Sequence, residues 1–387
     1  MRILFIWHAA VEPEYRKLFK ELSKEVGSLL VITPKSWTEG GKLQFFQEKK
    51  EIDFNYDIVP LSAIFRDKLR GHFYPNFIKI MSLIKKFQPD ILHLFEEPSS
   101  FVCTELISIL KIFSPNTKII LESFENLNVP QGYLYYYIQK FNLNNTDMLL
   151  TVPEEGKMLW KNRGYKNIIS KINVGIDERF FFKNNNSINL KNLEFLNIRE
   201  NIRICYIGRV VYEKGLHLLV NSFSMLLKNE GVDADLLIVG NGNSDYINDL
   251  KNIANQFGVT DKIFFIDSVD SNYLVSIYSK CDILVLPSIT TTKWKEQFGR
   301  VLIEAMACEV AVIGSSSGEI PNVIGDAGLI FKEGDGYDLY QKLKTLVINN
   351  NLRNELISKG KKMVENMYTW TAVAKQFKKY YSEIISN

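Results

Sequence analysis

The chain lacks the features that mark several large classes of protein. Its 387 residues include only four cysteines, which show neither close pairs nor the spacing of a zinc site, so we expect buried thiols and no metal. No apolar run is long enough to span a bilayer or to form the core of a signal peptide. The net charge of +3 is too small to indicate a nucleic-acid partner. These absences favour a cytoplasmic globular protein that could at most touch the inner face of a membrane.

What the sequence does contain is an alternation of strands and helices. The run MRILFIW is followed by an amphipathic helix over 15–26 and by a second strand, SLLVITP. This order indicates a parallel, doubly wound sheet, in which ligands collect beyond the carboxyl ends of the strands. A polar, asparagine-containing segment after residue 180 predicts a hinge. We therefore predict an α/β protein with a first domain at 1–180, a linker at 181–202 and a second domain at 203–369.

The most informative stretch is EQFGRVLIE, residues 296–304, which follows a strand-like run and opens a helical pattern. The backbone N–H groups of Phe298, Gly299 and Arg300 have no partner inside that helix, and with the helix dipole they attract anions. Glu296 and Glu304 bracket the helix start, and their carboxylates suit hydroxyl groups rather than phosphates. Phosphates flanked by hydroxyls on both sides describe a nucleotide sugar, so we predict that these five residues bind one.

The segment EQFGRVLIEAMA, followed by AVIGSSSGEIPNVIGDAGLIF, resembles the E-x7-E signature of retaining glycosyltransferases of family 4 (group 1). The resemblance is strong over 204–331 and weaker over 1–177. It implies the GT-B architecture, in which two Rossmann-like domains face a central cleft and a C-terminal helix, here about 370–387, crosses back to the first domain. The implied reaction is transfer of a sugar from a nucleoside diphosphate sugar to a saccharide or lipid-linked acceptor, with retention. No cofactor is implied, and a UDP-sugar is expected by family frequency.

The resemblance also assigns roles in the second half of the chain. Arg209 and Lys214 match the family's GR and EKG and are predicted to stabilise the leaving diphosphate, with Glu296 positioning the donor sugar as the third catalytic residue. Glu304 is expected to bind the ribose. Further donor contacts are predicted after three strand-like runs, at Gly208, Gly240 and Ser268. The string Asp233-Ala234-Asp235 matches a metal-binding D-x-D pattern, but it precedes a strand, so we expect no metal there.

Acceptor contacts are expected after the strands of the first half. This half departs from the family, because it has neither the glycine pair that follows the first strand in many relatives nor their donor-contacting histidine. Glu122 or Glu125 is a candidate to replace that histidine, whereas His93 lies within a strand and is expected to be structural. The acceptor-side candidates are His8, Tyr15, Arg16, Glu96, Glu97, Glu122 and Glu125.

Other interpretations stay open at this point. The amphipathic helix expected at 77–87 carries Lys79, Lys85 and Lys86, which could contact anionic lipid or simply be solvated. The polar loop expected at 35–50 is either a lip over the cleft or a surface loop. The same fold also hosts nucleotide-sugar epimerases, for which Glu122 or Glu125 could supply acid–base groups, sucrose-type synthases, and non-catalytic nucleotide-sugar-binding subunits.

Overall fold

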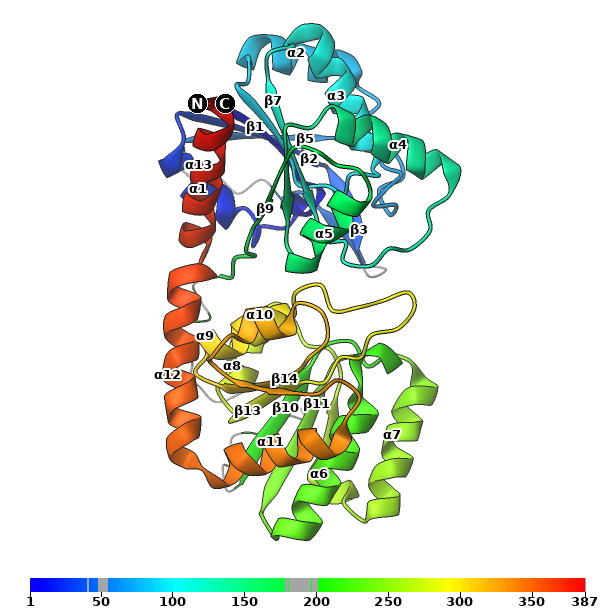
Figure 1. Ribbon diagram of the computed structural model, residues 1–387, viewed down its shortest axis with the longest axis vertical. Coiled ribbons are helices and arrows are strands. Elements are labelled where there is room, and N and C mark those ends of the chain that lie inside the picture. Colours follow the sequence, from blue (N-terminus) through cyan, green and yellow to red (C-terminus); the bar gives the residue numbers. More distant parts are fainter. Residues whose placement is uncertain (40–41, 48–54, 178–179, 181–195, 197–200, 387) are drawn as a thin grey trace. The chain divides into compact units, whose positions relative to one another are not determined.

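The computed structural model describes residues 1–39, 42–47, 55–177, 180, 196 and 201–386, which form two compact units (Figure 1). Unit 1 comprises Met1–Asp177 and Trp370–Asn387, and unit 2 comprises Glu178–Thr369. Within the predicted linker, 181–195 and 197–200 lie outside the described residues. Each unit is built on its own parallel sheet, so the predicted α/β class with two Rossmann-like domains is confirmed.

Unit 1 contains a seven-stranded sheet in the order β5-β2-β1-β6-β7-β8-β9, and every pairing in it is parallel. Its strands read as continuous apolar runs because helices cover both faces of the sheet. The order reverses at β1: the chain first moves outward through β2 to β5 and then returns to β6 on the other side of β1. The strands are β1 (Arg2–Ile6), β2 (Ser28–Pro34), β5 (Tyr56–Leu61), β6 (Ile91–Leu94), β7 (Lys118–Ser123), β8 (Met148–Thr151) and β9 (Ile168–Lys171).

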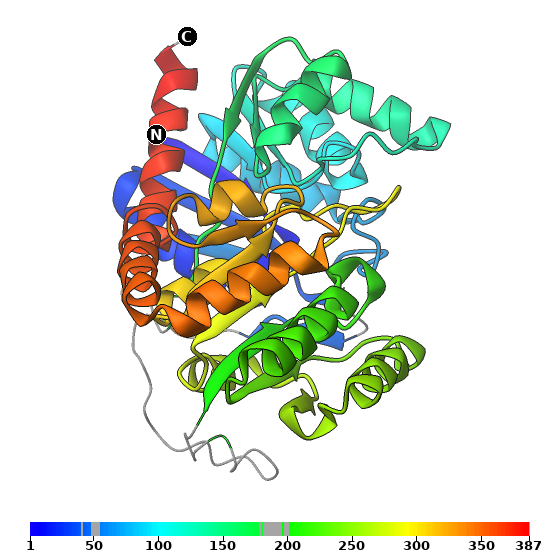
Figure 2. The same cartoon turned by 60° about the horizontal axis from the view of Figure 1, so that its bottom comes forward.

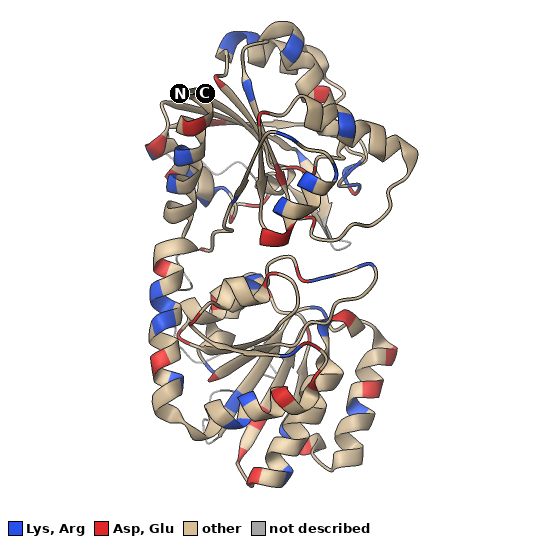
Figure 3. Cartoon of the chain, viewed as in Figure 1, with Lys and Arg blue, Asp and Glu red and all other residues tan. Residues whose placement is uncertain are grey.

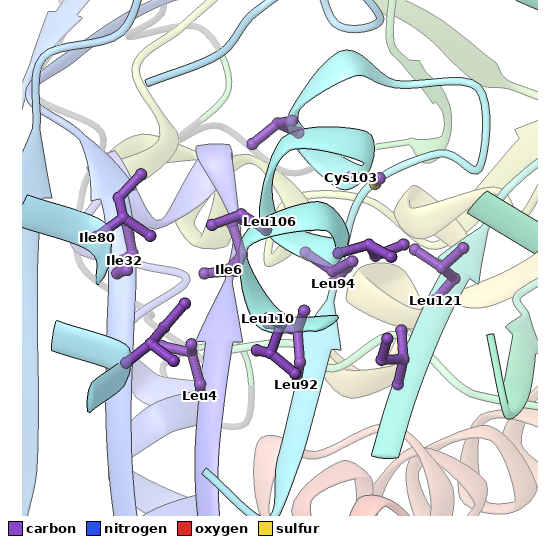
Figure 4. Close-up of a cluster of buried hydrophobic side chains, with 14 of the residues drawn as sticks. Leu4, Ile6, Ile32, Ile80, Leu92, Leu94, Cys103, Leu106, Leu110 and Leu121 are labelled. Carbon is purple, nitrogen blue, oxygen red and sulfur yellow. The ribbon is translucent and has the colours of Figure 1, made fainter. Parts of the chain in front are cut away.

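Alternate residues of these strands face two different helical layers. Leu4, Leu92 and Leu94 belong to a buried cluster with Leu106 of α3, shown in Figure 4. Phe5 faces the other way, and its ring lies 5.1 Å from that of Phe19 in α1 and 6.1 Å from that of Phe377 in α13. The first layer is α2 (Phe77–Phe87), α3 (Phe101–Phe113), α4 (Tyr133–Asn144) and α5 (Glu154–Asn162); the second is α1 (Lys17–Glu25) and α13 (Trp370–Ser386).

The polar segment at 35–50, expected to be a loop, instead contains a short antiparallel hairpin. Its strands are β3 (Ser36–Glu39) and β4 (Lys42–Phe45). Trp37 of β3 is buried against the 3-10 helix η1 (His8–Val11) and so anchors the hairpin on unit 1. The expectation of a plain loop missed that Trp37 stands between the polar residues Ser36 and Thr38, which suits a strand with one buried face. Leu43 pairs with Thr38 on the other face of the hairpin and is exposed.

Unit 2 contains a six-stranded parallel sheet in the order β12-β11-β10-β13-β14-β15. The order reverses between β10 and β13, so the loops that leave these two strands diverge at a switch point. Helices α6 and α11 pack side by side over one face (Figure 2). The strands are β10 (Ile202–Ile207), β11 (Ala234–Val239), β12 (Ile263–Ile266), β13 (Ile283–Leu286), β14 (Ala311–Ser315) and β15 (Leu329–Phe331).

The helices of unit 2 connect these strands in turn. Helix α9, the predicted E-x7-E helix, begins at Arg300 because Gly299 precedes it in a left-handed conformation with φ of 84°. The helices are η4 (Tyr212–Lys214), α6 (Leu216–Glu230), α7 (Ser244–Phe257), η5 (Thr260–Lys262), α8 (Ser271–Tyr278), α9 (Arg300–Ala307), α10 (Ile320–Ile324), α11 (Gly336–Ile348) and α12 (Asn350–Met367).

Candidate functional site

The candidate donor site lies where the strand order of unit 2 reverses, and glycines let its loops approach one another. A Cβ on Gly215 would lie 2.0 Å from the carbonyl oxygen of Pro287, which follows β13. A Cβ on Gly240 would lie 1.9 Å from the carbonyl oxygen of Gly208, which follows β10. All three glycines have positive φ values, so a side chain would be strained as well as blocked. Gly208 and Gly240 therefore have a structural role in shaping the loops, whatever they contact in a ligand.

An ion pair occupies this switch point. The ammonium of Lys214, at the end of η4, lies 2.6 Å from Oε2 of Glu296. Ser288, which follows β13, donates from its hydroxyl to the same oxygen at 2.8 Å. The Lys214 ammonium also lies 4.5 Å from the centre of the Trp294 ring, within the range of a cation–π interaction. The structure thus brings together two of the predicted catalytic residues and adds two supports for them.

The backbone of Glu296 is fixed by the segment after β14. Its carbonyl oxygen accepts a hydrogen bond from the N–H of Glu319 at 3.1 Å, and a Cβ on Gly318 would lie 1.9 Å from that oxygen. Ser315 donates from its hydroxyl to the carbonyl of Ser288 at 2.6 Å. The stretch 315–319 therefore holds the two loops that carry Ser288 and Glu296.

The other glutamate of the motif has a different environment. Glu304 is buried inside α9, where Tyr278 donates to its Oε2 at 3.0 Å and the Nε of Arg300 lies 3.0 Å from its Oε1. Burial and the nearby Glu304 carboxylate raise the pKa of the Tyr278 hydroxyl well above its ordinary value, so Tyr278 remains a hydrogen-bond donor. Phe298 is buried as well, with its ring 5.8 Å from that of Tyr368. Because the Phe298 side chain is buried and Gly299 has none, these two residues offer their backbone N–H groups at the start of α9. The sequence predicts an anion site at these groups.

The remaining donor candidates follow β10, β11 and β12 along the same edge of the sheet. Arg209 is exposed, and its carbonyl accepts a hydrogen bond from the buried Tyr206 hydroxyl at 2.6 Å. Ser268 exchanges two hydrogen bonds of 3.0 Å with the side chain of Asn241, linking the loops after β12 and β11. Because β11 and β10 separate β12 from β13 in the sheet, Ser268 is remote from the Lys214–Glu296 pair. The predicted donor residues thus spread along one edge rather than forming one cluster.

Unit 1 has a corresponding switch point between β1 and β6. The Oε1 atom of Glu96, after β6, accepts hydrogen bonds of 2.8 Å from the backbone N–H of His8 and from its Nδ1. His72 lies 3.9 Å from the same oxygen, and the centre of a Trp37 ring lies 4.6 Å from that of the His8 ring, with the two rings tilted by 40°. Burial would raise the pKa of Glu96, but the two histidines and the hydrogen bonds from His8 outweigh it and hold the pKa below its usual value. His8 and Glu96, both predicted, are brought together, whereas His72 and Trp37 were missed.

Two other acceptor-side candidates support the loop that follows β1. The guanidinium of Arg16 is buried, donates to the carbonyls of Ala10 and Val11 at 2.9 and 2.7 Å, and lies over the Phe46 ring. Tyr15 packs its ring 4.9 Å from that of Trp7. Arg16 therefore supports the loop, and its predicted contact with an acceptor stays a prediction.

The prediction for Glu122 requires correction. It was a candidate to hold sugar hydroxyls or to act in an epimerase, but it is buried, and its Oε1 lies 2.8 Å from Nε2 of His93. The other ring nitrogen of His93 lies 2.6 Å from the hydroxyl of Tyr381 in α13. Burial lowers the pKa of His93 to about 3 and raises that of Glu122, so this is a neutral core network. His93 is structural, as predicted, and Glu122 lies in the core beneath α13.

The last two candidates follow β6 and β7. Glu97 accepts hydrogen bonds of 2.8 Å from the Ser123 hydroxyl and the Phe124 N–H, and burial, with the nearby Glu125 charge, raises its pKa to about 7. Glu125 lies between two arginines: Arg70 reaches one oxygen at 2.8 Å, and Arg163 reaches the other at 2.5 Å. Both carboxylates are thus engaged within unit 1, and their predicted contact with an acceptor stays a prediction.

Several supporting residues escaped the sequence reasoning. Ser288 and Trp294 flank the loop that leads to Glu296, and proximity to the motif was the one signal that could have identified them. His72 and Asn241 carry no such signal, because their partners are distant in the sequence. Among the described residues, no group of three or more His, Cys, Asp or Glu side chains is placed to hold a metal ion. Asp233 precedes β11, as expected, and its carboxylate pairs with Lys262 at 2.7 Å.

Comparison with known proteins finds relatives of this chain. Residues 191–363 match the family described as glycosyl transferases group 1. The capsular polysaccharide biosynthesis glycosyltransferase CapM of Staphylococcus aureus is 24% identical over 376 residues, which cover 89% of this chain and 93% of CapM. The N-acetyl-alpha-D-glucosaminyl L-malate synthase of Bacillus anthracis is 24% identical over 322 residues, covering 79% of this chain and 78% of the synthase.

Solved structures resemble the fold over almost the whole chain. HepE of Anabaena in complex with UDP aligns with a TM-score of 0.72 at 14% identity, covering 99% of this chain and 100% of HepE. Sucrose-phosphate synthase of Thermosynechococcus elongatus aligns with a TM-score of 0.71 at 18% identity, covering 99% of both chains. Residues 191–363 thus belong to the group 1 glycosyltransferases, and the whole chain has the GT-B fold.

Proposed function

We propose that this glycosyltransferase moves a sugar from a nucleoside diphosphate sugar to a saccharide or lipid-linked acceptor, with retention at the anomeric carbon. The observation that carries the proposal is the Lys214–Glu296 pair beside the start of α9. It combines a cation and the backbone N–H groups at the start of a helix, which suit phosphates, with a carboxylate, which suits hydroxyls. HepE, which shares the fold, has been solved with UDP, with UDP and glucose, and with UDP-glucose, which supports a UDP-sugar as the donor.

The chemistry follows from these groups. Cleavage of the bond between the sugar and the diphosphate leaves negative charge on the diphosphate, which Lys214, Arg209 and the N–H groups at the start of α9 would stabilise as it develops. Glu296 would hold the sugar hydroxyls in position. Binding of the donor requires Lys214 to turn from Glu296 toward phosphate, and Ser288 would then keep the carboxylate in place.

Retention requires the acceptor to attack the face that the diphosphate leaves. The acceptor hydroxyl would give its proton to an oxygen of the departing phosphate, so no protein nucleophile is needed. Glu304, held by Tyr278 and Arg300, would bind the ribose hydroxyls. The similarity to CapM, a glycosyltransferase of capsular polysaccharide biosynthesis, supports a saccharide acceptor. A lipid-linked acceptor would require contact with a membrane surface.

The test is nucleotide release from a panel of UDP-, GDP-, ADP- and CDP-sugars, with binding measured in parallel. We expect the wild type to bind one class of nucleotide sugar and to hydrolyse it slowly. Lys214→Ala and Glu304→Gln should each lose both the binding and the hydrolysis. Lys262→Ala is a matched control, because this lysine also pairs with a carboxylate but lies before β12, at the opposite edge of the sheet. If no nucleotide sugar binds, or if Lys214→Ala binds as well as Lys262→Ala, the proposal is wrong.

A further inference from the structure

Helix α4 of unit 1 presents an unusual surface for a solvated helix. Tyr133, Leu134, Tyr136, Tyr137 and Phe141 are all exposed, and Leu134 and Tyr137 retain 59% and 64% of their accessible surface. The helix buries Ile138 and Leu143 on its inner side, so these outer residues are not needed for its packing on the sheet. Exposed apolar residues are ordinary when scattered, but a run along one helix indicates an interaction surface.

The neighbouring helices extend this surface. Helix α3 packs between α2 and α4: the Lys85 ammonium of α2 lies 4.5 Å from the centre of the Phe113 ring, and Thr104 donates to the side chain of Asn142 at 2.9 Å. Phe77 and Ile78 of α2 and Ile112 of α3 are exposed as well. The outer sides of α2, α3 and α4, which we call the α2–α4 face, therefore form one continuous layer.

The charges of the α2–α4 face have one sign. Five lysines of these helices are exposed, and the three helices contain a single acidic residue, Glu105 (Figure 3). Glu105 accepts a hydrogen bond from the Tyr74 N–H at 2.9 Å, and burial raises its pKa to about 7, so it is only partly ionised near neutral pH. The exposed lysines are Lys79, Lys85, Lys86, Lys111 and Lys140.

We infer that the α2–α4 face of unit 1 binds a membrane surface that carries anionic headgroups. Tyrosine rings and aliphatic side chains suit the boundary between headgroups and acyl chains, and lysines reach past them to anionic lipid. A second copy of the chain fits this face less well. A two-fold contact would place the five lysines of one copy against the same five lysines of the other, and these like charges would repel each other. The inference goes beyond the proposed transfer reaction, and lipid binding can be measured without any activity.

The experiment is co-sedimentation of the full chain with vesicles of equal parts phosphatidylglycerol and phosphatidylcholine, and with vesicles of phosphatidylcholine alone. The wild type should bind the anionic vesicles, and added salt should weaken the binding. Combined Lys79→Gln, Lys111→Gln and Lys140→Gln should weaken it about a hundredfold, at roughly fivefold per lysine. The matched control is Lys20→Gln, Lys375→Gln and Lys379→Gln, which removes three exposed lysines from the opposite helical layer of the same unit.

The apolar contribution has its own control pair. Leu134→Ser with Tyr137→Ser should weaken binding at least about tenfold, whereas Tyr337→Ser with Ile348→Ser, which are 63% and 59% exposed on α11, should not. The inference is overturned if the wild type stays in solution with anionic vesicles, or if control and test variants bind alike. It is also overturned if light scattering shows a dimer that Leu134→Ser with Tyr137→Ser dissociates, because the occupant is then a second copy.

Discussion

The two units share a switch point in the strand order, but different residues lie at it. In both sheets the strand order reverses beside the first strand, and in both a carboxylate on one side of the reversal pairs with a nitrogen on the other. In unit 1 the pair is Glu96 with the imidazole of His8, and in unit 2 it is Glu296 with the ammonium of Lys214. The side chain of Glu96 is 0% exposed and that of Glu296 is 9% exposed.

The difference concerns which ligand each edge can accept. Lysine keeps its charge through the physiological range, and the start of α9 adds further positive potential beside it, so the edge of unit 2 suits a diphosphate. The corresponding pair of unit 1 is a buried carboxylate with a histidine, and a second histidine lies beside it. Similar folds therefore diverge in the few residues after equivalent strands, as expected where function depends on the site and not on the fold.

The largest expected effect comes from breaking the pair in unit 2. Glu296→Gln keeps the shape of the side chain but loses the charge that holds Lys214 and the sugar. We expect the transfer rate to fall by a factor on the order of a hundred to a thousand, while the nucleoside diphosphate alone binds as tightly as before or tighter, because Lys214 no longer has to leave a carboxylate. Steady-state kinetics and calorimetry would measure the two quantities. An equal loss of both would show that Glu296 holds the fold of the loop and not the sugar.

A second prediction concerns the close approach that builds this edge. Gly215 and Gly258 both have φ of 67°, but a Cβ on Gly215 would lie 2.0 Å from the Pro287 carbonyl oxygen, whereas one on Gly258 would meet nothing within 4 Å. Gly258→Ala should lower the free energy of unfolding by about 1 kcal/mol, and Gly215→Ala by about 3 kcal/mol or more. Urea denaturation would compare them. Equal losses would mean that the loop after β13 adapts freely.

A third prediction uses pH to separate the units. Burial and Glu125 raise the pKa of Glu97 from 4.5 to about 7, so the folded unit 1 binds this proton more tightly than the unfolded chain. The stabilisation is complete below pH 4.5 and is lost as pH rises through 7. Glu97→Gln should therefore stabilise unit 1 at pH 8 by at most about 3 kcal/mol, and have little effect at pH 4.5. Urea denaturation at both pH values measures this, and an equal effect at both would contradict it.

The smallest expected effect tests the support for Lys214. Trp294→Leu keeps an apolar side chain but removes the cation–π interaction with Lys214. The KM for the donor should therefore rise roughly tenfold, which corresponds to the loss of a partly desolvated cation–π interaction. Trp294→Phe should restore most of the loss, and kcat should change less than KM. If leucine and phenylalanine behave alike, the ring acts by packing alone, and Lys214 is positioned by Glu296 and not by Trp294.

Much of this organisation is contained in the sequence. Apolar runs such as 1–7 and 282–288 predict buried parallel strands, and the residues that follow them, including His8, Glu96 and Lys214, are therefore expected at the ligand edge of a sheet. The position of EQFG before a helix with a regular apolar face also predicts the anion site at Gly299. These features depend on neighbours within a few residues, and for that reason periodicity and spacing reveal them.

The tertiary structure decided which of these polar residues remain available for a ligand. Glu122 ends a strand just as Glu96 and Glu97 follow one, yet it faces α13 and pairs with His93, whose other partner, Tyr381, lies 288 residues away. Glu296 and Trp294 meet Lys214 because the order of the strands places β13 beside β10. Local patterns determine which faces are buried, but the strand order and the packing of distant helices determine which side chains meet, and these depend on interactions across the whole unit.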